Sequence, residues 1–216
     1  MSDIKKLISI IIPVFNESES IGFLLDEVIN VMLLNKFNFE LIVVNDGSKD
    51  NTQQVLKQLT LKIKELSVIS LRKNYGQTAA MSAGFDNSKG DIVITLDGDL
   101  QNDPNDIPIL ISEINNGYDL ICGWRFDRKD KLINRKIPSK IANKLIAHVT
   151  GLKLHDYGCS LKAFKKEIID DIKLYGELHR FLPVLANIEG ARIKEIKVNH
   201  RSRQYGSSKY LSLIHI

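Results

Sequence analysis

Two carboxylates, Asp97 and Asp99, stand one residue apart at the end of an apolar run, residues 92–96. Such a run is typical of a buried parallel strand, and open α/β sheets bind ligands outside the carboxyl ends of their strands. Neighbouring carboxylates repel each other unless a cation lies beside them, and oxygen ligands favour Mg²⁺ or Mn²⁺. The pair therefore indicates a metal site. The alternative is an acidic turn that caps the next helix, although Asp103 is better placed to do that.

The segments that must position this pair alternate between strand-like and helix-like patterns, as in a parallel sheet with helical crossovers. Strands are expected over residues 8–15, 40–45, 66–71, 92–96, 118–123 and 192–199. Helices are expected from Ser18 or Ser20 to residue 34, from Asp50 or Asn51 to residue 63, over residues 78–85, and over residues 104–116.

Polar residues follow three of these strands. They are Asn16 and Glu17, then Asp46, Gly47 and Ser48, and finally Asp97 and Asp99. Each acid alone could belong to an ordinary turn. Because parallel strands end at one edge of a sheet, the three groups together favour a nucleotide and metal site. The chain has no Gly-x-Gly-x-x-Gly or Walker loop, which argues against a dinucleotide dehydrogenase and a P-loop NTPase.

The charge of the chain is divided between its halves. Residues 1–122 hold 10 basic and 17 acidic side chains, whereas residues 123–216 hold 20 and 9, for a net charge of +4. The basic half suggests an anionic partner: nucleic acid, a membrane surface or a phosphorylated substrate. Residues 127–149 predict an amphipathic helix that lies on an anionic membrane, or else packs on the core with a solvated basic face. No recognised nucleic-acid motif is present, so nucleic acid is not expected.

Length and composition, 216 residues with 44% hydrophobic, suit one large domain. Two cysteines, Cys122 and Cys159, are too few for a disulfide framework, so a reducing compartment is expected. The chain lacks a signal-peptide cleavage site and any apolar run of the roughly 18 residues that span a bilayer. A soluble or peripheral protein is therefore expected. Residues 150–190 read as loop-rich, and residues 211–216 read as a truncated end.

Five motifs occur in order along the chain. They are Ile-Pro-Val-Phe-Asn-Glu, Val-Asn-Asp-Gly-Ser, Leu-Asp-Gly-Asp-Leu-Gln, His-Arg-Phe-Leu-Pro and Arg-x-x-Gly-x-Ser-Lys. Together they resemble glycosyltransferase family 2, and within it the polyprenyl-phosphate glycosyltransferases, the relatives of dolichol-phosphate mannose synthase and bactoprenol glucosyltransferases. The likeness covers almost all of residues 5–210.

The resemblance implies a GT-A fold: an α/β, Rossmann-like architecture with a mostly parallel central sheet flanked by helices. It implies one catalytic domain over residues 1–210, with a nucleotide and metal half (1–122) and an acceptor half (123–210). The donor is then a UDP- or GDP-sugar, the metal Mg²⁺ or Mn²⁺, and the acceptor a polyprenyl phosphate. The resemblance implies that transfer inverts the configuration at the anomeric carbon. It also implies that the reaction takes place at the cytoplasmic face of a membrane. Family members often continue into transmembrane spans, which this sequence lacks.

The resemblance also assigns residues to these tasks. The nucleotide is held by Pro13, Asn16, Glu17, Asp46, Gly47, Asp97 and Gly98. The metal is held by Asp97, Asp99 and Gln101. The acceptor phosphate is contacted by Arg125, Arg135, Ser139, Arg203 and Lys209. The catalytic set is Asp97, Asp99, Gln101, Arg125 and Arg203.

This chemistry suits the charge pattern. A cation stabilises the leaving diphosphate, and a lipid phosphate, already anionic at neutral pH, needs no strong general base. The enzyme must instead position two anions with cationic groups. The basic half is expected to supply those groups.

Other functions remain as alternatives. A haloacid-dehalogenase-type phosphatase also places Asp-x-Asp after an apolar strand, but as the first strand of its domain, and Gln101 replaces its usual Thr or Val. A sugar nucleotidyltransferase would carry a glycine-rich N-terminal signature that is missing here. A catalytically silent binding module is a further possibility. Among transferases, the alternative acceptor is a carbohydrate hydroxyl of a cell-surface polysaccharide.

Overall fold

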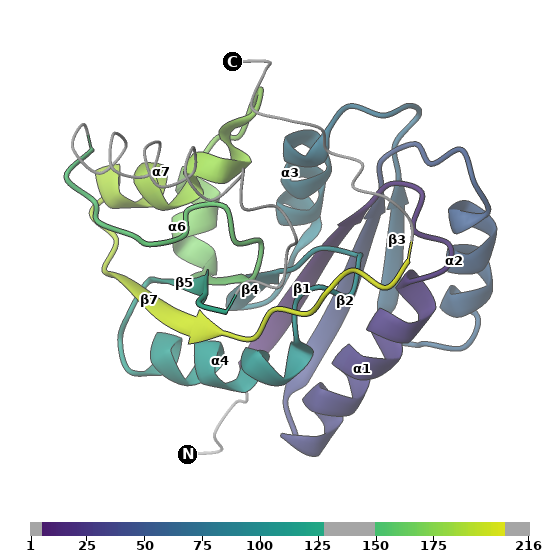
Figure 1. Ribbon diagram of the computed structural model, residues 1–216, viewed down its shortest axis with the longest axis horizontal. Helices are drawn as coiled ribbons and strands as arrows, with labels where there is room; N and C mark the ends of the chain where they lie inside the picture. Colours follow the sequence, from purple (N-terminus) through teal and green to yellow (C-terminus); the bar gives the residue numbers. More distant parts are fainter. Residues whose placement is uncertain (1–5, 128–149, 206–216) are drawn as a thin grey trace.

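A seven-stranded sheet runs through the part of the chain that the computed structural model describes, residues 6–127 and 150–205 (Figure 1). The strands lie side by side in the order β3-β2-β1-β4-β6-β5-β7. Their bounds are β1 (Leu7–Val14), β2 (Asn38–Asn45), β3 (Leu66–Ser70), β4 (Ile92–Thr95), β5 (Leu120–Arg125), β6 (Lys162–Lys165) and β7 (Ile193–Val198). The expected α/β fold with a mostly parallel sheet is confirmed.

The direction of the strands decides where the polar residues gather. β1 pairs in parallel with β2 and β4, and β2 pairs in parallel with β3. β6 is antiparallel to both of its neighbours, β4 and β5, while β5 and β7 are parallel. Six strands therefore point the same way, and their carboxyl ends share one edge of the sheet.

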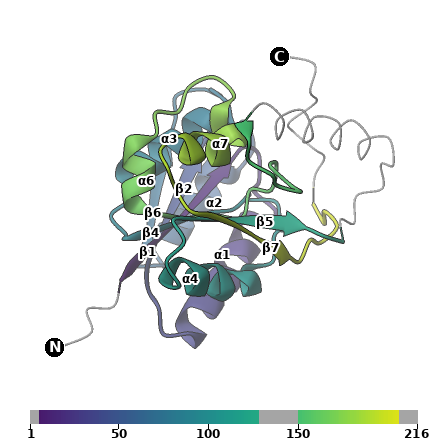
Figure 2. The same cartoon turned by 90° about the vertical axis from the view of Figure 1, so that its left-hand side faces the viewer.

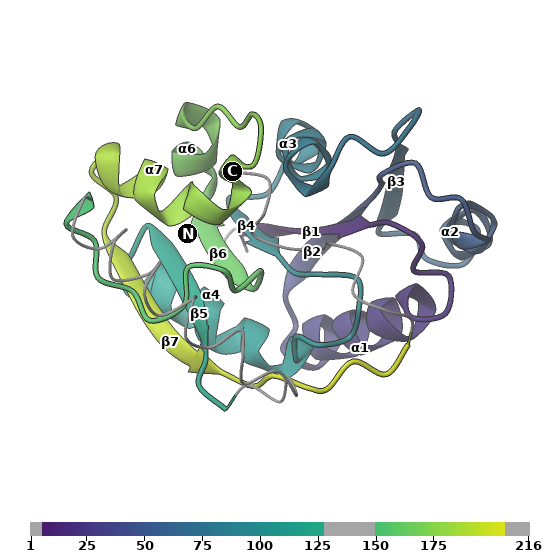
Figure 3. The ribbon, with the colours of Figure 1, turned by 45° about the horizontal axis from the view of Figure 1, so that its top comes forward.

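Helices cover both faces of the sheet (Figure 3). Alternate residues of β1 face opposite clusters: Ile10 and Ile12 pack toward α1, α2 and α4, whereas Ile11 packs toward α3, α6 and α7. This burial on both faces explains why the strand is an apolar run and not an alternating one. The helical bounds are α1 (Ile21–Leu34), α2 (Thr52–Thr60), α3 (Gln77–Asn87), η1 (Pro104–Asp106), α4 (Ile107–Asn115), α6 (Lys166–Asp171), η2 (Leu178–Phe181) and α7 (Leu182–Ile188).

Close packing of α3 depends on Gly84. A Cβ atom at this position would lie 2.4 Å from Cγ2 of Ile11 on β1. The helix thus lies directly against the middle of the sheet, as its small residues suggested. In the view of Figure 2, β5 and β7 lie between α7 on one face and α4 on the other.

The prediction of a loop-rich region over residues 150–190 is wrong. Strand β6 inserts between β4 and β5, and α6, η2 and α7 follow it. The sequence pattern did not predict this strand because it is only four residues long and carries a lysine at each end. Lys162 is nonetheless buried, 3% exposed, and its ammonium group donates to the carbonyl oxygens of Cys159 and Tyr157.

Two other expectations concern the ends of elements. Ser20 occupies the N-cap position of α1, but its hydroxyl makes no capping bond. Asp103 caps η1 by accepting a hydrogen bond from the backbone N–H of Asn105.

Among the residues that the structure describes, no helix has the length and apolar character needed to cross a bilayer. The predicted basic helix over residues 127–149 lies almost entirely outside the described residues.

Candidate active site

The loop after β4, residues 96–102, is here called the acidic loop. It turns back on itself and carries Asp97 and Asp99 to the carboxyl edge of the sheet. Leu100 has a positive φ of 63°, and the Asp97 N–H donates to Oδ1 of Asn102 at 3.3 Å. The hydroxyl of Ser20, the N-cap residue of α1, lies 2.8 Å from the carbonyl oxygen of Gly98 and 2.8 Å from Oε2 of Glu17. The β1–α1 loop therefore supports the acidic loop from beside it.

The loops after β1 and β2 are also tied together. The Asn16 N–H donates to Oγ of Ser48 (2.9 Å), and the Lys49 N–H donates to Oδ1 of Asn16 (2.7 Å). The Glu17 N–H donates to Oγ1 of Thr52 (2.9 Å). The three polar groups that follow β1, β2 and β4 lie together at one edge of the sheet, as their positions after parallel strands predict.

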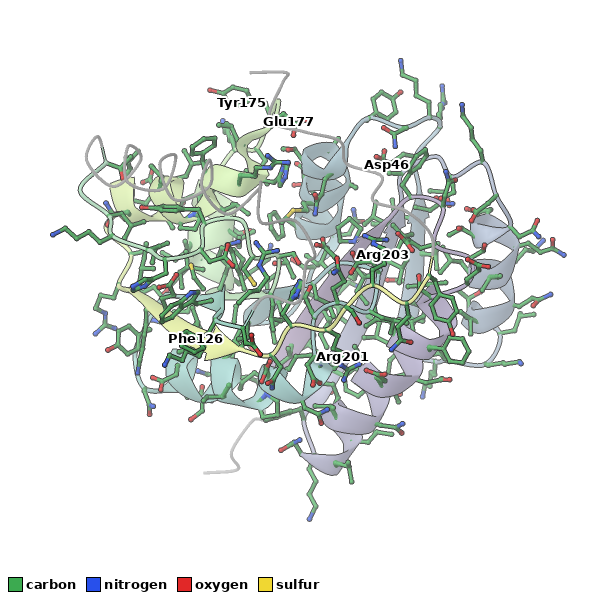
Figure 4. The ribbon with its side chains drawn as sticks, in the orientation of Figure 1. Asp46, Phe126, Tyr175, Glu177, Arg201 and Arg203 are labelled. Carbon is green, nitrogen blue, oxygen red and sulfur yellow. The ribbon has the colours of Figure 1, made fainter. Side chains whose placement is uncertain are left out.

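Asp46, at the end of β2, is fully buried and holds the loop that precedes α3 (Figure 4). Its two carboxylate oxygens accept hydrogen bonds from the backbone N–H groups of Tyr75 (2.7 Å) and Gly76 (2.9 Å). Burial raises the pKa of this carboxyl, and the two backbone donors act in the opposite direction. Asp46 thus fixes the start of α3 relative to β2.

Gly47 allows the same loop to approach. Its φ is +65°, and a Cβ atom there would lie 2.3 Å from the carbonyl carbon of Lys73. Only glycine fits this combination of a left-handed backbone and a backbone contact. Within the described residues, Asn16 and Gly47 hold loops together, while Pro13 and Glu17 line the small cavity described below.

Residues 199–205, here called the strap, run from the end of β7 across the sheet toward α1 (yellow in Figure 1). The strap pairs with the acidic loop: His200 forms an antiparallel bridge with Asn102, and the Arg201 N–H donates to the Gln101 carbonyl oxygen at 2.8 Å. At its end, the ring of Tyr205 stacks on that of Phe23 in α1, with centroids 5.9 Å apart.

Arg201 anchors the strap on two elements. Its guanidinium group donates to Oε2 of Glu27 on α1 (2.7 Å) and to Oδ1 of Asp103 beside η1 (2.8 Å). These ion pairs raise the pKa of Arg201, against the effect of burial. The strap is therefore held in place on both sides of the acidic loop.

Arg203 reaches from the strap into the site (Figure 4). Its Nη2 forms an ion pair with Oδ2 of Asp99, and its Nη1 lies 3.6 Å from Oε1 of Glu17. This Nη1 is buried and makes no hydrogen bond to the described residues. A cavity of about 30 Å³ beside it is lined by Pro13, Phe15, Glu17, Asp97, Gly98, Asp99 and Arg203.

The donor set around Asp99 suits a divalent cation. Asp99 is 7% exposed, and burial together with the nearby charge of Asp97 raises its pKa to about 6, although Arg203 acts to lower it. A carboxylate in this setting is stabilised by a positive charge. The described residues hold no cluster of three His, Cys, Asp or Glu side chains arranged for a metal. Mg²⁺ commonly binds one or two carboxylates and completes its shell with substrate phosphates, which two aspartates allow.

Gln101 lies beside these carboxylates. Its backbone N–H donates to Oδ1 of Asp99 at 3.1 Å, and its side-chain Nε2 lies 3.4 Å from the Arg201 carbonyl oxygen. Its side-chain oxygen is of the type that Mg²⁺ and Mn²⁺ accept as a ligand. The predicted metal residues Asp97, Asp99 and Gln101 are thus on one short loop, with the strap against it.

Arg125, at the end of β5, is committed to a buried ion pair. Its Nε and Nη2 donate to the two carboxylate oxygens of Asp156, at 2.7 and 2.9 Å. The pairing lowers the pKa of Asp156 and raises that of Arg125, in each case against the effect of burial. Arg125 is therefore placed at the carboxyl edge, two strands away from Asp97, with its orientation fixed.

A second set of contacts connects α3 with the loop after β4 and with the acceptor half. The Gln77 side chain donates from Nε2 to Oδ1 of Asp97 at 2.8 Å. The Thr78 hydroxyl lies 2.6 Å from Nδ1 of His179 in η2. Burial, with the charges of Arg180 and Lys162, lowers the pKa of His179 to about 4, so its ring is neutral at pH 7.

Sequence reasoning did not find several residues of this site. These residues, Gln77, Asp156, His179 and Arg201, all act through contacts distant in sequence. Among them only His179 stands in one of the five quoted motifs, and no site role was assigned to it. Three predicted site residues, Arg135, Ser139 and Lys209, lie outside the described residues.

Known proteins resemble this chain in sequence and in fold. Residues 9–173 match the family model of glycosyl transferase family 2. A dodecaprenyl-phosphate galacturonate synthase from Rhizobium johnstonii is 47% identical over 207 residues, which cover 94% of this chain and 61% of that protein. An undecaprenyl-phosphate 4-deoxy-4-formamido-L-arabinose transferase from Proteus mirabilis is 42% identical over 221 residues, which cover 100% of this chain and 68% of that protein. The chain thus spans only about three fifths of the first relative.

Solved structures agree on the fold. Mannosyl-3-phosphoglycerate synthase from Rubrobacter xylanophilus superposes with a TM-score of 0.73 at 14% identity, over 93% of this chain and 68% of that one. Glucosyl-3-phosphoglycerate synthase from Mycobacterium tuberculosis, in complex with Mn²⁺ and UDP-glucose, gives a TM-score of 0.69 at 19% identity, over 94% and 72%. At these identities the likeness bears on the fold alone, and the predicted GT-A fold is confirmed.

Proposed function

Because this chain belongs to glycosyl transferase family 2, we propose that it moves a sugar from a UDP- or GDP-sugar to a polyprenyl phosphate, such as undecaprenyl or dolichyl phosphate. The names of the relatives from Rhizobium johnstonii and Proteus mirabilis, both of polyprenyl-phosphate sugar transfer, support this acceptor. The transfer is proposed to be assisted by Mg²⁺ or Mn²⁺ and to invert the anomeric carbon.

The observation that carries this proposal is the ion pair of Arg203 with Asp99. It brings a cation of the basic half onto the carboxylates of the acidic half. A reaction between two phosphate-bearing substrates needs such an arrangement, because each anion must be neutralised while the two are held close together. Glu17 lies within 3.6 Å of the same guanidinium group, so the basic and acidic groups meet at one point.

The pairing of Asp156 with Arg125 makes this carboxylate a poor general base for a hydroxyl acceptor. A hydroxyl must lose its proton during transfer, and a general base works best with a pKa near the working pH. Asp156 lies beside β5 in the acceptor half, but both of its oxygens accept from Arg125 and its pKa is lowered. It is therefore a weak base. A phosphate acceptor needs no such base.

In the proposed reaction, an oxygen of the acceptor phosphate forms a bond with the anomeric carbon as the bond to the nucleoside diphosphate breaks. A bound Mg²⁺ or Mn²⁺ would stabilise the negative charge of the leaving diphosphate. Asp97, Asp99 and Gln101 would hold this cation. Arg203 would bind a substrate phosphate with its guanidinium group, and Arg125 would contact the acceptor phosphate from the end of β5.

The nucleotide is proposed to occupy the edge between β1, β2 and β4. Pro13, Glu17, Asp97 and Gly98 line the cavity beside Asp99 and would contact the nucleotide directly. The remaining proposed residues, Asn16, Asp46 and Gly47, act on it through the loops that they hold.

The acceptor is proposed to reach the site from a membrane surface at its cytoplasmic face. Phe126, directly after β5, is 60% exposed, and the ammonium group of Lys197 lies 4.1 Å from its ring centre and 5.5 Å from that of Trp124. An exposed aromatic ring beside lysine suits the boundary between lipid and water. In the sequence, Phe126 comes just before the strongly basic segment 128–149, whose charge would favour an anionic surface.

The experiment that tests this function incubates the full-length protein with UDP- and GDP-sugars, Mn²⁺, and undecaprenyl or dolichyl phosphate. The expected product is a lipid-linked sugar, detected by mass spectrometry of the organic extract. Reactions without lipid, and reactions with an oligosaccharide in its place, serve as controls. Transfer to the oligosaccharide and not to the lipid would replace this proposal with the polysaccharide alternative.

A further inference from the structure

The first turn of α3 connects three parts of the site. On the nucleotide side, Asp46 accepts hydrogen bonds from the N–H groups of Tyr75 and Gly76, the two residues before the helix. At the first helical residue, Gln77 donates to Oδ1 of Asp97 at 2.8 Å. At the next, the Thr78 hydroxyl lies 2.6 Å from Nδ1 of His179 in η2. Consecutive residues thus contact β2, the acidic loop and the acceptor half.

The Gln77 amide is suited to orient Asp97 without changing its charge. A lysine or arginine in its place would neutralise the carboxylate and compete with a bound cation. A neutral amide donor instead occupies one oxygen and restricts rotation of the group, while the negative charge is retained. Groups that donate to metal ligands in this way commonly contribute 10- to 100-fold to metal affinity.

The position of Gln77 is fixed by its neighbours. Gly76 has a φ of +94°, which aims the chain from the end of the loop into the helix. Thr78 is 2% exposed, and its partner His179 carries no charge at pH 7 because burial lowers its pKa to about 4. The contact between them is therefore a short, partly buried hydrogen bond that joins α3 to η2.

We propose that Gln77 is a positioning residue for Asp97, and that His179, through Thr78, holds the turn of α3 from which Gln77 reaches the acidic loop. This inference rests on the proposed function, because it takes Asp97 to be a ligand of the catalytic cation. It also makes η2 part of the metal site, although η2 belongs to the acceptor half.

The test measures Mn²⁺ affinity in the full-length protein by electron paramagnetic resonance, with UDP and then GDP present. Gln77→Met keeps the length of the side chain and removes the amide. It is expected to weaken Mn²⁺ binding by about 10- to 100-fold. Gln77→Glu is expected to alter affinity as well, because it puts a second carboxylate beside Asp97. Gln58→Met, the same change on the exposed side of α2, is the matched control and should bind Mn²⁺ like the wild type.

The link to His179 is tested by Thr78→Val, which removes the hydroxyl and preserves the shape. This variant is expected to weaken Mn²⁺ binding by a few-fold, and the double variant Gln77→Met/Thr78→Val should be no weaker than Gln77→Met alone. If the losses of Mn²⁺ affinity in the two single variants multiply in the double variant, Thr78 acts independently of Gln77. That result would overturn this part of the proposal. Thermal unfolding of each variant separates loss of metal affinity from loss of folded protein.

Two negative results have different meanings. If the wild type binds Mn²⁺ and Gln77→Met binds it equally well, Gln77 does not position Asp97, and the proposed function stands. If the wild type binds no Mn²⁺ with either nucleotide, the metal-assisted reaction and the inference that rests on it are both overturned.

Discussion

Arg203 and Asp99 form an ion pair across 104 positions of the chain. The pair exists because the strap, residues 199–205, lies against the acidic loop after β4. Asp99 is buried beside Asp97, so a positive charge at this point stabilises the folded protein.

Asp99→Asn is expected to reduce metal-dependent transfer by at least about 100-fold, because the variant loses the charge that holds the cation. The fold should remain intact, since the substitution preserves shape and removes a buried carboxylate. Transfer to lipid phosphate with Mn²⁺ and thermal unfolding measure the two effects. Asp86→Asn, on the exposed side of α3, is the control and should retain full activity. Retained turnover in Asp99→Asn would remove Asp99 from the metal site.

Arg203→Ala is expected to raise KM for the lipid phosphate by about 10- to 100-fold, the usual cost of a lost hydrogen bond between charged groups. KM for the nucleotide sugar should change much less. Steady-state kinetics with each substrate varied in turn make the comparison, and Arg192→Ala, which removes an exposed arginine, is the control. An equal loss with both substrates would place Arg203 on the donor.

The stability of the protein should fall as the pH falls from about 6.5 to about 4, through His179. Its pKa is lowered to about 4 in the folded protein, so over this range only the unfolded chain binds a proton at this residue. The unfolded chain is thereby favoured, by about 2 kcal/mol at pH 5. Urea unfolding at pH 7.5 and pH 5, for the wild type and His179→Gln, isolates this contribution. An equal pH dependence in both proteins would contradict it.

Asp156→Asn is expected to lower the free energy of unfolding by about 3–5 kcal/mol, because it leaves Arg125 buried without its charge partner. Asp170→Asn is a matched control, since the ion pair of Asp170 with Lys166 is exposed and worth less than about 1 kcal/mol. Chemical denaturation measures both. Comparable small effects would mean that the Arg125–Asp156 pair contributes little to folding.

Gly47→Ala is expected to destabilise the protein by about 1–3 kcal/mol through its left-handed backbone, with a further cost from the contact with Lys73. Gly22→Ala is the opposite case: nothing lies within 4 Å of its Cβ position in the first turn of α1. That change should leave stability unaltered or raise it by up to about 1 kcal/mol. A destabilised Gly22→Ala or a neutral Gly47→Ala would contradict this reasoning.

Much of the fold follows from local pattern. The apolar runs of β1, β2 and β4 predict parallel strands buried on both faces, and parallel strands bring Glu17, Asp46 and Asp99 to one edge. Strand β6 could not be predicted in this way. Lys162 is a poor candidate for a buried strand, and only the carbonyl oxygens of Tyr157 and Cys159, supplied by the folded loop, make its burial possible.

The site was predictable where its residues adjoin in sequence and unpredictable where they meet through the fold. Asp97 and Asp99 stand one residue apart on a short loop, so their spacing alone indicates a cation site, whereas Gln101 was added by the resemblance. Asp46 was expected to contact the nucleotide, yet its oxygens hold the N–H groups of Tyr75 and Gly76, which no spacing rule connects to it. The same holds for the contact of Gln77 with Asp97.

The insertion of β6 between β4 and β5 acts as a spacer. Adjacent strands lie about 4.8 Å apart, so the ends of β4 and β5 are separated by about 10 Å, set by backbone hydrogen bonding. Asp97 follows one of these strands and Arg125 ends the other. Were the two strands neighbours, the guanidinium group could neutralise the carboxylate directly. The antiparallel strand instead sets the spacing between the backbone that carries Asp97 and the backbone that carries Arg125, and with it the room between these two groups of the proposed site.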